Sequence, residues 1–457
     1  MSFFDSLRDI ALKAPELLAP AGTLAHLDYA YAYGADAVYA GMPRYGLRVR
    51  ENDFDMHNLQ VGINKAHGMG KKIYITANIL PHNSKIKTFV KDLTPMVDMK
   101  PDALIMADPG LMMLAREAWP DMPIHLSVQA NTVNYATVRF WQSMGVERII
   151  LSRELSLDEV EEIRQQCPDM ELEVFVHGAL CIAYSGRCLL SGYINHRDPN
   201  QGTCTNACRW KYNEVEGKEH ESGDIEAVQY EDAADVDKGV ERGVGDIERI
   251  LVEEEGRPGE AMVMEEDDNG TYIMNSKDLR AVEHVERLAK IGVDSLKIEG
   301  RTKSINYVSR VTQSYRQAID DAVAGRQFDP ALFGKLENLA SRGYTDGFFK
   351  RHHTHEYQNY VQGHSKESQQ KLVGEVIGYD HNDGMLEFLS KNQLLKGDQV
   401  ELILPQGNRV FNVDQLQKLN AAELEKIPGG GMKFRVPVDA ASLDMDSMQY
   451  GLLAKFL

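Results

Sequence analysis

Between residues 16 and 180 the chain repeats one arrangement, in which a short apolar run is followed by an amphipathic stretch of ten to fifteen residues. The amphipathic stretches have helical periodicity, and several end in glycine, which is typical of a helix C-terminus. The apolar runs are continuous rather than alternating, which indicates strands buried on both faces, as in a parallel sheet. Seven such runs are present: ELLAPAG (16–22), DAVYAG (36–41), KIYITANI (72–79), DALIMADPG (102–110), IHLSVQAN (124–131), RIILSREL (148–155) and LEVFVHGAL (172–180).

Seven strand–helix units are one short of a closed eightfold barrel. Beyond an acidic insertion, two further apolar runs at 271–279 and 295–301 enclose a helix pattern. We therefore expect an α/β fold, a (β/α) TIM-like barrel that is irregular in its last units. A doubly wound open sheet is the alternative, but no phosphate-binding glycine fingerprint follows the first strand.

The character of the sequence changes beyond residue 350, where a polar linker leads into short β-rich runs separated by turn residues. This pattern is typical of a small antiparallel β-barrel. The expected organisation is the first part of the barrel with a cysteine cluster (1–213), an acidic insertion (214–268), barrel completion with a helical segment (269–350), a linker (351–370) and a C-terminal antiparallel β-barrel domain (371–457).

The negative charge of the chain is concentrated in the insertion. The formal net charge is −19, and residues 214–268 hold 21 Asp or Glu against 5 Lys or Arg, which leaves −3 for the rest. An acidic total therefore does not exclude an RNA partner, because a basic face can exist elsewhere. The N-terminal residues lack the features of a signal peptide, and no apolar window is long enough to span a membrane. We expect a cytoplasmic protein without a membrane partner.

Four of the five cysteines lie in one short segment, at Cys181, Cys188, Cys204 and Cys208. A cytoplasmic chain of this length is not expected to need a disulfide framework, so a tight cluster of thiols indicates metal binding or catalysis. Four thiolates satisfy either a 4Fe-4S cluster or a tetrahedral zinc ion. Neither close pair has the two-residue spacing typical of zinc ribbons, which favours the cluster and leaves zinc as the alternative. Cys167 is interpreted as an ordinary thiol.

The run from Glu173 to Ser191 has the pattern E-x-F-x-x-G-A-L-C-x4-G-x-C-x-L-S. It resembles the signature of the collagenase-like peptidases, the thirty-second peptidase family of unknown catalytic type. The segments ELLAPAG, GADAVYAG, NSKDL, KIEGR and RGYTDGF are similar to other landmarks of that family. The likeness spans nearly the whole chain and is greatest to a bacterial branch that modifies tRNA.

The resemblance implies prephenate-dependent hydroxylation of the wobble uridine of tRNA to 5-hydroxyuridine, the first step toward 5-carboxymethoxyuridine. It also implies that the four cysteines are the ligands of the cluster, which iron–sulfur assembly machinery would supply. The tRNA anticodon loop and prephenate are then the expected partners. The strip from Arg209 to Tyr212 interleaves basic and aromatic residues, a composition suited to single-stranded RNA.

Residues at the carboxyl ends of barrel strands line the active face in this fold class. We expect His177 and Glu299 to be catalytic. The alternatives are a hydrogen-bonded structural histidine and an ion-paired structural carboxylate. The expected anion-binding residues are Arg48, Arg50, Lys297 and Arg301, because guanidinium forks suit carboxylates and phosphates. Further polar residues at predicted strand ends are Asn78, Asp108, Gln129, Asn131, Arg153 and Glu154.

Two other functions stay open. A collagenase-like peptidase is the first, although the sequence has no H-E-x-x-H, G-x-S-x-G or local cysteine-protease signature. The second is a non-enzymatic iron–sulfur scaffold that binds RNA and positions another protein.

Overall fold

The computed structural model describes most of the barrel and of the C-terminal part in full. It describes residues 12–47, 53–180, 278–339, 344–350, 370–380, 382–438 and 448–457, and between 212 and 271 only the backbone of six strands. None of the described helices combines the length and apolarity needed to cross a bilayer.

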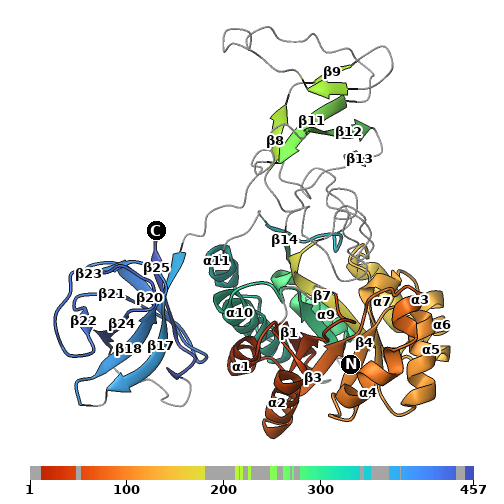
Figure 1. The fold of residues 1–457 in the computed structure, drawn as a ribbon, viewed down its shortest axis with the longest axis horizontal. Helices are drawn as coiled ribbons and strands as arrows, with labels where there is room; N and C mark the ends of the chain where they lie inside the picture. The colour runs from red at the N-terminus through yellow and green to blue at the C-terminus, as the bar shows by residue number, and fades with distance from the viewer. Residues whose placement is uncertain are drawn as a thin grey trace, which may run out of the picture.

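Eight parallel strands close into a ring, so the predicted (β/α) barrel is confirmed (Figure 1). Each strand pairs with the next, and the last pairs with both the seventh and the first. Nearly every residue of these strands is buried, as their continuous apolar runs predicted. The strands are β1 (Glu16–Pro20), β2 (Ala37–Gly41), β3 (Lys72–Thr76), β4 (Ala103–Met106), β5 (Ile124–Leu126), β6 (Arg148–Ile150), β7 (Glu171–Ala179) and β15 (Ser295–Ile298).

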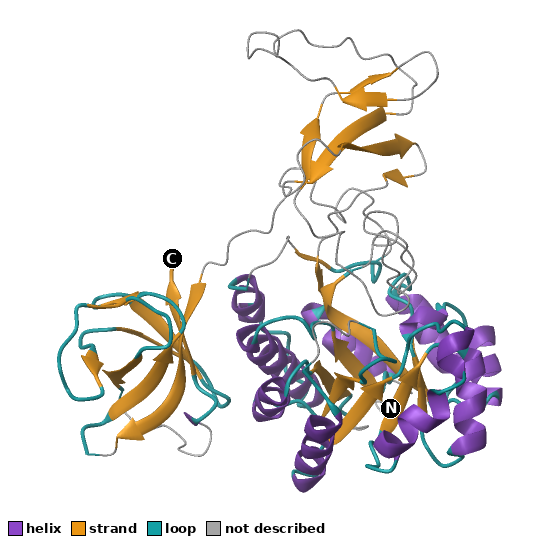
Figure 2. Ribbon diagram, viewed as in Figure 1, coloured by secondary structure: helices purple, strands orange, loops and turns teal. Residues whose placement is uncertain are grey.

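Helices surround the strand ring and cover its outer face (Figure 2). Most begin at a side-chain cap; at α7, Ser156 and Glu159 form the capping box that their spacing indicates. The helices are α1 (Leu24–Ala32), α2 (Met56–Gly68), α3 (Asn83–Ile86), α4 (Phe89–Val97), α5 (Pro109–Ala118), α6 (Tyr135–Ser143), α7 (Leu157–Gln166), α9 (Val285–Ile291), α10 (Ile305–Val323) and α11 (Ala331–Glu337), with 3-10 turns at Val128–Ala130 and Val282–His284.

The barrel is irregular after β7, as expected. The run predicted at 271–279 contributes β14 (Asp278–Arg280), which pairs antiparallel with β7 outside the ring and is joined by β16 (Tyr344–Thr345). The run predicted at 295–301 contributes β15, the strand that closes the ring. The register between β15 and β7 shifts there, with Lys297 opposite Phe175 and Ile298 opposite His177. Such a shift breaks the alternation of faces along β7.

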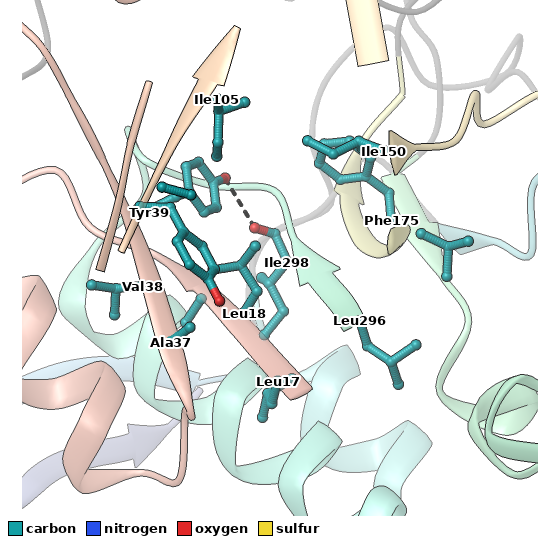
Figure 3. Close-up of a cluster of buried hydrophobic side chains, with 14 of the residues drawn as sticks. Leu17, Leu18, Ala37, Val38, Tyr39, Ile105, Ile150, Phe175, Leu296 and Ile298 are labelled. Atoms are coloured by element: carbon teal, nitrogen blue, oxygen red, sulfur yellow. Dashed lines mark hydrogen bonds between the residues drawn. The ribbon is translucent and has the colours of Figure 1, made fainter. Parts of the chain in front are cut away.

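Apolar side chains from several barrel strands form a buried cluster (Figure 3). Tyr39 belongs to this cluster, and its hydroxyl donates a hydrogen bond of 3.0 Å to the carbonyl of Ile298. This bond links the second strand to the closing strand at the carboxyl end of the ring.

The strands described within the acidic insertion and beside it are antiparallel. Four form one sheet in the order β13-β12-β11-β8, and two form a hairpin. Their bounds are β8 (Tyr212–Val215), β9 (Gly217–Glu219), β10 (Ile225–Ala227), β11 (Glu248–Glu254), β12 (Ala261–Asp267) and β13 (Gly270–Thr271).

The C-terminal part is a curled antiparallel sheet, which confirms the predicted antiparallel fold (Figure 1). Seven strands follow the order β21-β20-β25-β17-β18-β24-β22, and β19 pairs with β23. Phe388 and Phe434 stack in its core with ring centroids 5.3 Å apart. The strands are β17 (Gln370–Asp380), β18 (Met385–Ser390), β19 (Leu394–Leu395), β20 (Gln399–Ile403), β21 (Arg409–Asn412), β22 (Gln417–Lys418), β23 (Lys426–Ile427), β24 (Lys433–Pro437) and β25 (Leu452–Phe456).

The curled sheet docks on α10 and on the end of α1 through buried polar contacts. The Arg310 guanidinium donates to Oε1 of Gln370 (2.5 Å) and to Oε2 of Glu401 (2.8 Å). The Tyr33 hydroxyl lies 3.0 Å from the carbonyl of Ile403, and Nε2 of Gln313 donates to the carbonyl of Leu404 at 2.7 Å. These contacts fix the sheet against the outer helices of the barrel.

Candidate anion-binding pocket at the barrel mouth

A cavity of about 110 Å³ lies where the strands of the barrel end. This is the face on which barrel enzymes carry their active sites. A larger hollow of about 620 Å³ lies outside the ring, beside α7 and α9, and no barrel strand contributes to its walls. We therefore take the mouth cavity as the candidate site. Its polar walls consist of Thr76, Asn78, Ser127, Gln129, Arg153, Lys297, Glu299 and Arg301.

Arg153, which follows β6, is held rigidly at one side of the cavity. Its Nη1 donates to the carbonyl of Ala179 at 2.8 Å, and its Nη2 lies 3.2 Å from Oε2 of Glu299. The guanidinium also lies 3.8 Å above the centroid of the Phe175 ring. Three different neighbours thus fix one cation, which spares a bound anion the cost of ordering it.

Arg301 provides a second cation, just beyond the end of β15. Its Nη1 donates to the hydroxyl of Thr76 at 3.1 Å, and its Nη2 donates to the carbonyl of Leu47 at 2.5 Å. The residue is buried, with 7% of its surface exposed. The bond to Thr76 ties this cation to β3, across the ring from Arg153.

Lys297 provides the third cation, on β15 itself. Its Nζ lies 2.8 Å from Oε1 of Glu173, which also contacts Arg148 through Oε2 at 3.3 Å. Burial lowers the pKa of Lys297, although the attraction of Glu173 raises it in part. Beneath the cavity, Arg148 continues the network to Glu16, with Nη1 and Oε1 2.6 Å apart.

The structure brings together three of the predicted site residues: Lys297, Glu299 and Arg301. Asn78, Gln129 and Arg153, named from the strand ends, also line the cavity. Asp108, Asn131 and Glu154 are not among its lining residues. Asp108 instead caps α5, where its carboxylate accepts a hydrogen bond of 2.8 Å from the Leu111 amide. Glu299 is ion-paired, as its structural alternative supposed, and a catalytic role for it stays a prediction.

His177 does not line this cavity. Its ring lies among Tyr307, Tyr315 and Tyr344, with centroid separations of 5.8, 5.5 and 5.5 Å. The register shift between β7 and β15 accounts for this placement, because it breaks the alternation that would turn His177 inward. Complete burial, with smaller contributions from Lys303 and Arg280, lowers the pKa of His177 to about 3. Burial therefore favours the neutral form of the ring, whose Nδ1 lies 3.4 Å from the Tyr315 hydroxyl, and a catalytic role for His177 stays a prediction.

Six predicted site residues lie outside the described residues: Arg48, Arg50, Cys181, Cys188, Cys204 and Cys208. Whether the four thiols fit a cluster is therefore untested by this structure. The described chain does show where the cysteine segment starts. Ala179, whose carbonyl accepts the hydrogen bond from Arg153, is two residues before Cys181. Cys167 is buried, and its thiol lies 3.6 Å from the carbonyl of Tyr135, in keeping with an ordinary thiol.

Sequence reasoning missed the aromatic and carboxylate partners of the cations. Tyr39 and Phe175 lie in predicted strands but were not connected with the site. Glu173 was missed as the partner of Lys297. Glu173 and Lys297 each interrupt an otherwise apolar strand, and a buried charge needs a partner. This pattern could have indicated that the two residues pair.

Two family models together match most of the chain. The model of peptidase family U32 matches residues 22–359, and that of the family's C-terminal domain matches residues 368–449. The chain belongs to peptidase family U32. This confirms the resemblance on which the expected function rests.

Several relatives of the chain are named for RNA modification. The chain is 59% identical to tRNA hydroxylation protein P of Escherichia coli, covering 93% of this chain and 94% of that protein. It is 55% identical to the protein of the same name in Haemophilus influenzae, covering 97% and 96%. A more distant relative, the 23S rRNA 5-hydroxycytidine C2501 synthase of Escherichia coli, is 31% identical over 73% of this chain and 42% of its own length.

Proposed function

We propose that this U32 protein is a tRNA hydroxylase that converts the wobble uridine to 5-hydroxyuridine, with prephenate as a required co-substrate. One structural observation carries the proposal: three cationic side chains, the buried Lys297 and Arg301 and the partly buried Arg153, line one cavity at the mouth of the barrel. Prephenate has two carboxylates, and guanidinium groups bind carboxylates in paired hydrogen bonds. The names of the relatives support RNA hydroxylation as the reaction class.

In this proposal the described residues bind and orient the small co-substrate. Arg153 and Arg301 each take one carboxylate, since they are tied to opposite parts of the ring by Ala179 and Thr76. Asn78 and Gln129 offer amide groups to the remaining oxygens. Arg48 and Arg50 are proposed as further anion-binding residues.

The proposal also includes a 4Fe-4S cluster on Cys181, Cys188, Cys204 and Cys208, with zinc as the alternative. Protein purified without oxygen should contain roughly four irons and four sulfides per chain. Cys204→Ala and Cys208→Ala should lose them. Tightly bound zinc in their place would exclude the cluster from the reaction.

Reconstitution tests the proposed reaction directly. Purified protein with its metal content intact is incubated with unmodified tRNA, prephenate and a reductant. The nucleosides are then analysed by mass spectrometry. We expect 5-hydroxyuridine only when prephenate is present. Product that forms only when a further protein is added would indicate a scaffold, and cleavage of denatured collagen without any modified nucleoside would indicate a peptidase.

A pair of arginine variants tests the cavity itself. Arg153→Ala should raise the KM for prephenate by roughly 10- to 100-fold, the usual effect of losing hydrogen bonds to a charged group. Arg139→Ala is the matched control, because Arg139 lies on α6 and contacts Gln166 at the surface. Equal KM values in the two variants would exclude Arg153 as a ligand of the co-substrate.

A further inference from the structure

Lys297 is a primary amine, 4% exposed, in the wall of a cavity, with a carboxylate oxygen 2.8 Å away. The proposed function uses it only as a cation. A buried amine beside a carboxylate can do more, because the carboxylate can take its proton and leave a nucleophilic nitrogen. The acceptor here is Glu173, which is fully buried.

Arg148, the other cation beside Glu173, keeps its charge balanced after Glu173 takes the proton from Lys297. Nη1 of Arg148 lies 3.3 Å from Oε2 of Glu173, on the oxygen that does not face Lys297. Arg148 is itself fixed by Glu16 and Glu171 at 2.6 and 2.8 Å. The proton transfer makes Lys297 and Glu173 neutral together, and Arg148 keeps two carboxylates, so no buried charge is left isolated.

Two aromatic rings place Lys297 between the two arginines of the cavity. Its Nζ is 5.4 Å from the centroid of Phe175, over which Arg153 also lies. It is 4.5 Å from the centroid of Tyr39, and the Arg301 guanidinium is 5.9 Å from the same centroid. An acid whose carboxylate is held by either arginine would thus bring its neighbouring carbon atoms toward the amine.

We propose that Lys297 forms an imine with the carbonyl carbon of a 2-oxo acid bound in this cavity, with Arg153 holding the adjacent carboxylate. The inference deepens the proposed function and rests on it, since prephenate carries a 2-oxo acid side chain. Arg301, which lies near the aromatic ring of Tyr39, would hold the second carboxylate of such a molecule.

The step balances without an oxidant or reductant. Glu173 takes one proton from the ammonium group, and the Nζ lone pair forms a bond to the ketone carbon. The carbon–oxygen double bond breaks, and its oxygen leaves as water with two protons, the one held by Glu173 and one from the nitrogen. The product is a carbon–nitrogen double bond to Lys297, which withdraws electrons from the bound acid.

Reductive trapping tests this inference on the wild-type protein. The full-length protein is incubated with pyruvate, phenylpyruvate or prephenate, treated with sodium cyanoborohydride, and analysed by intact mass and peptide mapping. We expect roughly one adduct per chain on Lys297, heavier by the mass of the acid minus one oxygen atom. Lactate, which has no ketone, should give none.

Two lysine variants complete the test. Lys297→Arg keeps a cation beside Glu173 and should reduce trapping by about tenfold or more. Lys303→Arg is the control, because Lys303 lies outside the cavity and is 3.9 Å from Asp278. It should trap as the wild type does.

The outcomes separate this inference from the proposed function. Absence of an adduct on Lys297 in wild-type protein that still hydroxylates tRNA would overturn the imine and leave the function standing. An adduct on Lys297 in protein that does not hydroxylate tRNA would support the imine and overturn the proposed function. Adducts spread over surface lysines would also overturn the assignment.

Discussion

At the scale of single residues, the charged groups inside the barrel are the most sensitive positions. Glu173→Ala should lower the free energy of unfolding by roughly 3–5 kcal/mol, because it leaves Lys297 and Arg148 buried without this partner. Glu171→Ala removes another carboxylate from Arg148, but one that is half exposed, so it should cost less than about 1 kcal/mol. Urea titrations followed by circular dichroism provide the comparison; equal losses would contradict a buried ionic core.

His177 gives the protein a predictable response to acid. Its folded pKa of about 3 lies below the ordinary 6.5, so between these values the unfolded chain binds a proton that the folded chain does not. Stability should therefore fall as the pH drops below 6.5, by about 1.4 kcal/mol per pH unit from this group. Unfolding temperatures measured between about pH 4 and 7 should depend less steeply on pH in His177→Phe than in the wild type.

At the scale of elements, the contact between β7 and β15 sets the geometry of the mouth. Gly178 has φ of +101°, and a Cβ there would lie 2.5 Å from the carbonyl of Glu299. Gly178→Ala should cost roughly 1–3 kcal/mol or more and displace Glu299, with loss of activity. Gly334→Ala, inside α11 with open space around it, should instead stabilise by about 0.5–1 kcal/mol. Thermal shifts of opposite sign are the expected readout.

The elements themselves could largely be predicted, because local pattern determines them. Buried parallel strands such as β2 and β4 are continuous apolar runs, and the Ser156 capping box marks the start of α7. Which run closes the ring could not be predicted. Both β14 and β15 look like strands, and only long-range pairing with β1 excludes β14 from the barrel.

Part of the candidate site could also be predicted from the sequence. Lys297, Glu299 and Arg301 follow from the rule that strand ends line the mouth. The rule fails for His177 because a register shift is a property of two paired strands rather than of one sequence. It fails for Asp108 because the carboxylate has a local use as a helix cap.

At the scale of the whole molecule, one buried ion pair joins the curled sheet to the barrel. Arg310→Ala leaves Glu401 without that cation and should weaken the docking by roughly 3–5 kcal/mol. Hydrogen–deuterium exchange should then rise in β20 and β25, which face α1 and α10. Arg287→Ala, which removes an exposed arginine of α9 that pairs with Asp158, is the control and should leave this exchange unchanged. Unchanged exchange in both variants would show that apolar contacts suffice.

The curled sheet contacts the barrel through backbone carbonyls and through side chains, and only the side-chain contacts depend on the sequence of the sheet. Tyr33 and Gln313 bind backbone carbonyls, which a sheet of any sequence would present. Arg310 binds the side chains of Gln370 and Glu401, which only a matching sequence supplies. A hybrid can be made from this barrel and the C-terminal part of another family member. It should assemble only if its sheet also carries the two side chains equivalent to Gln370 and Glu401.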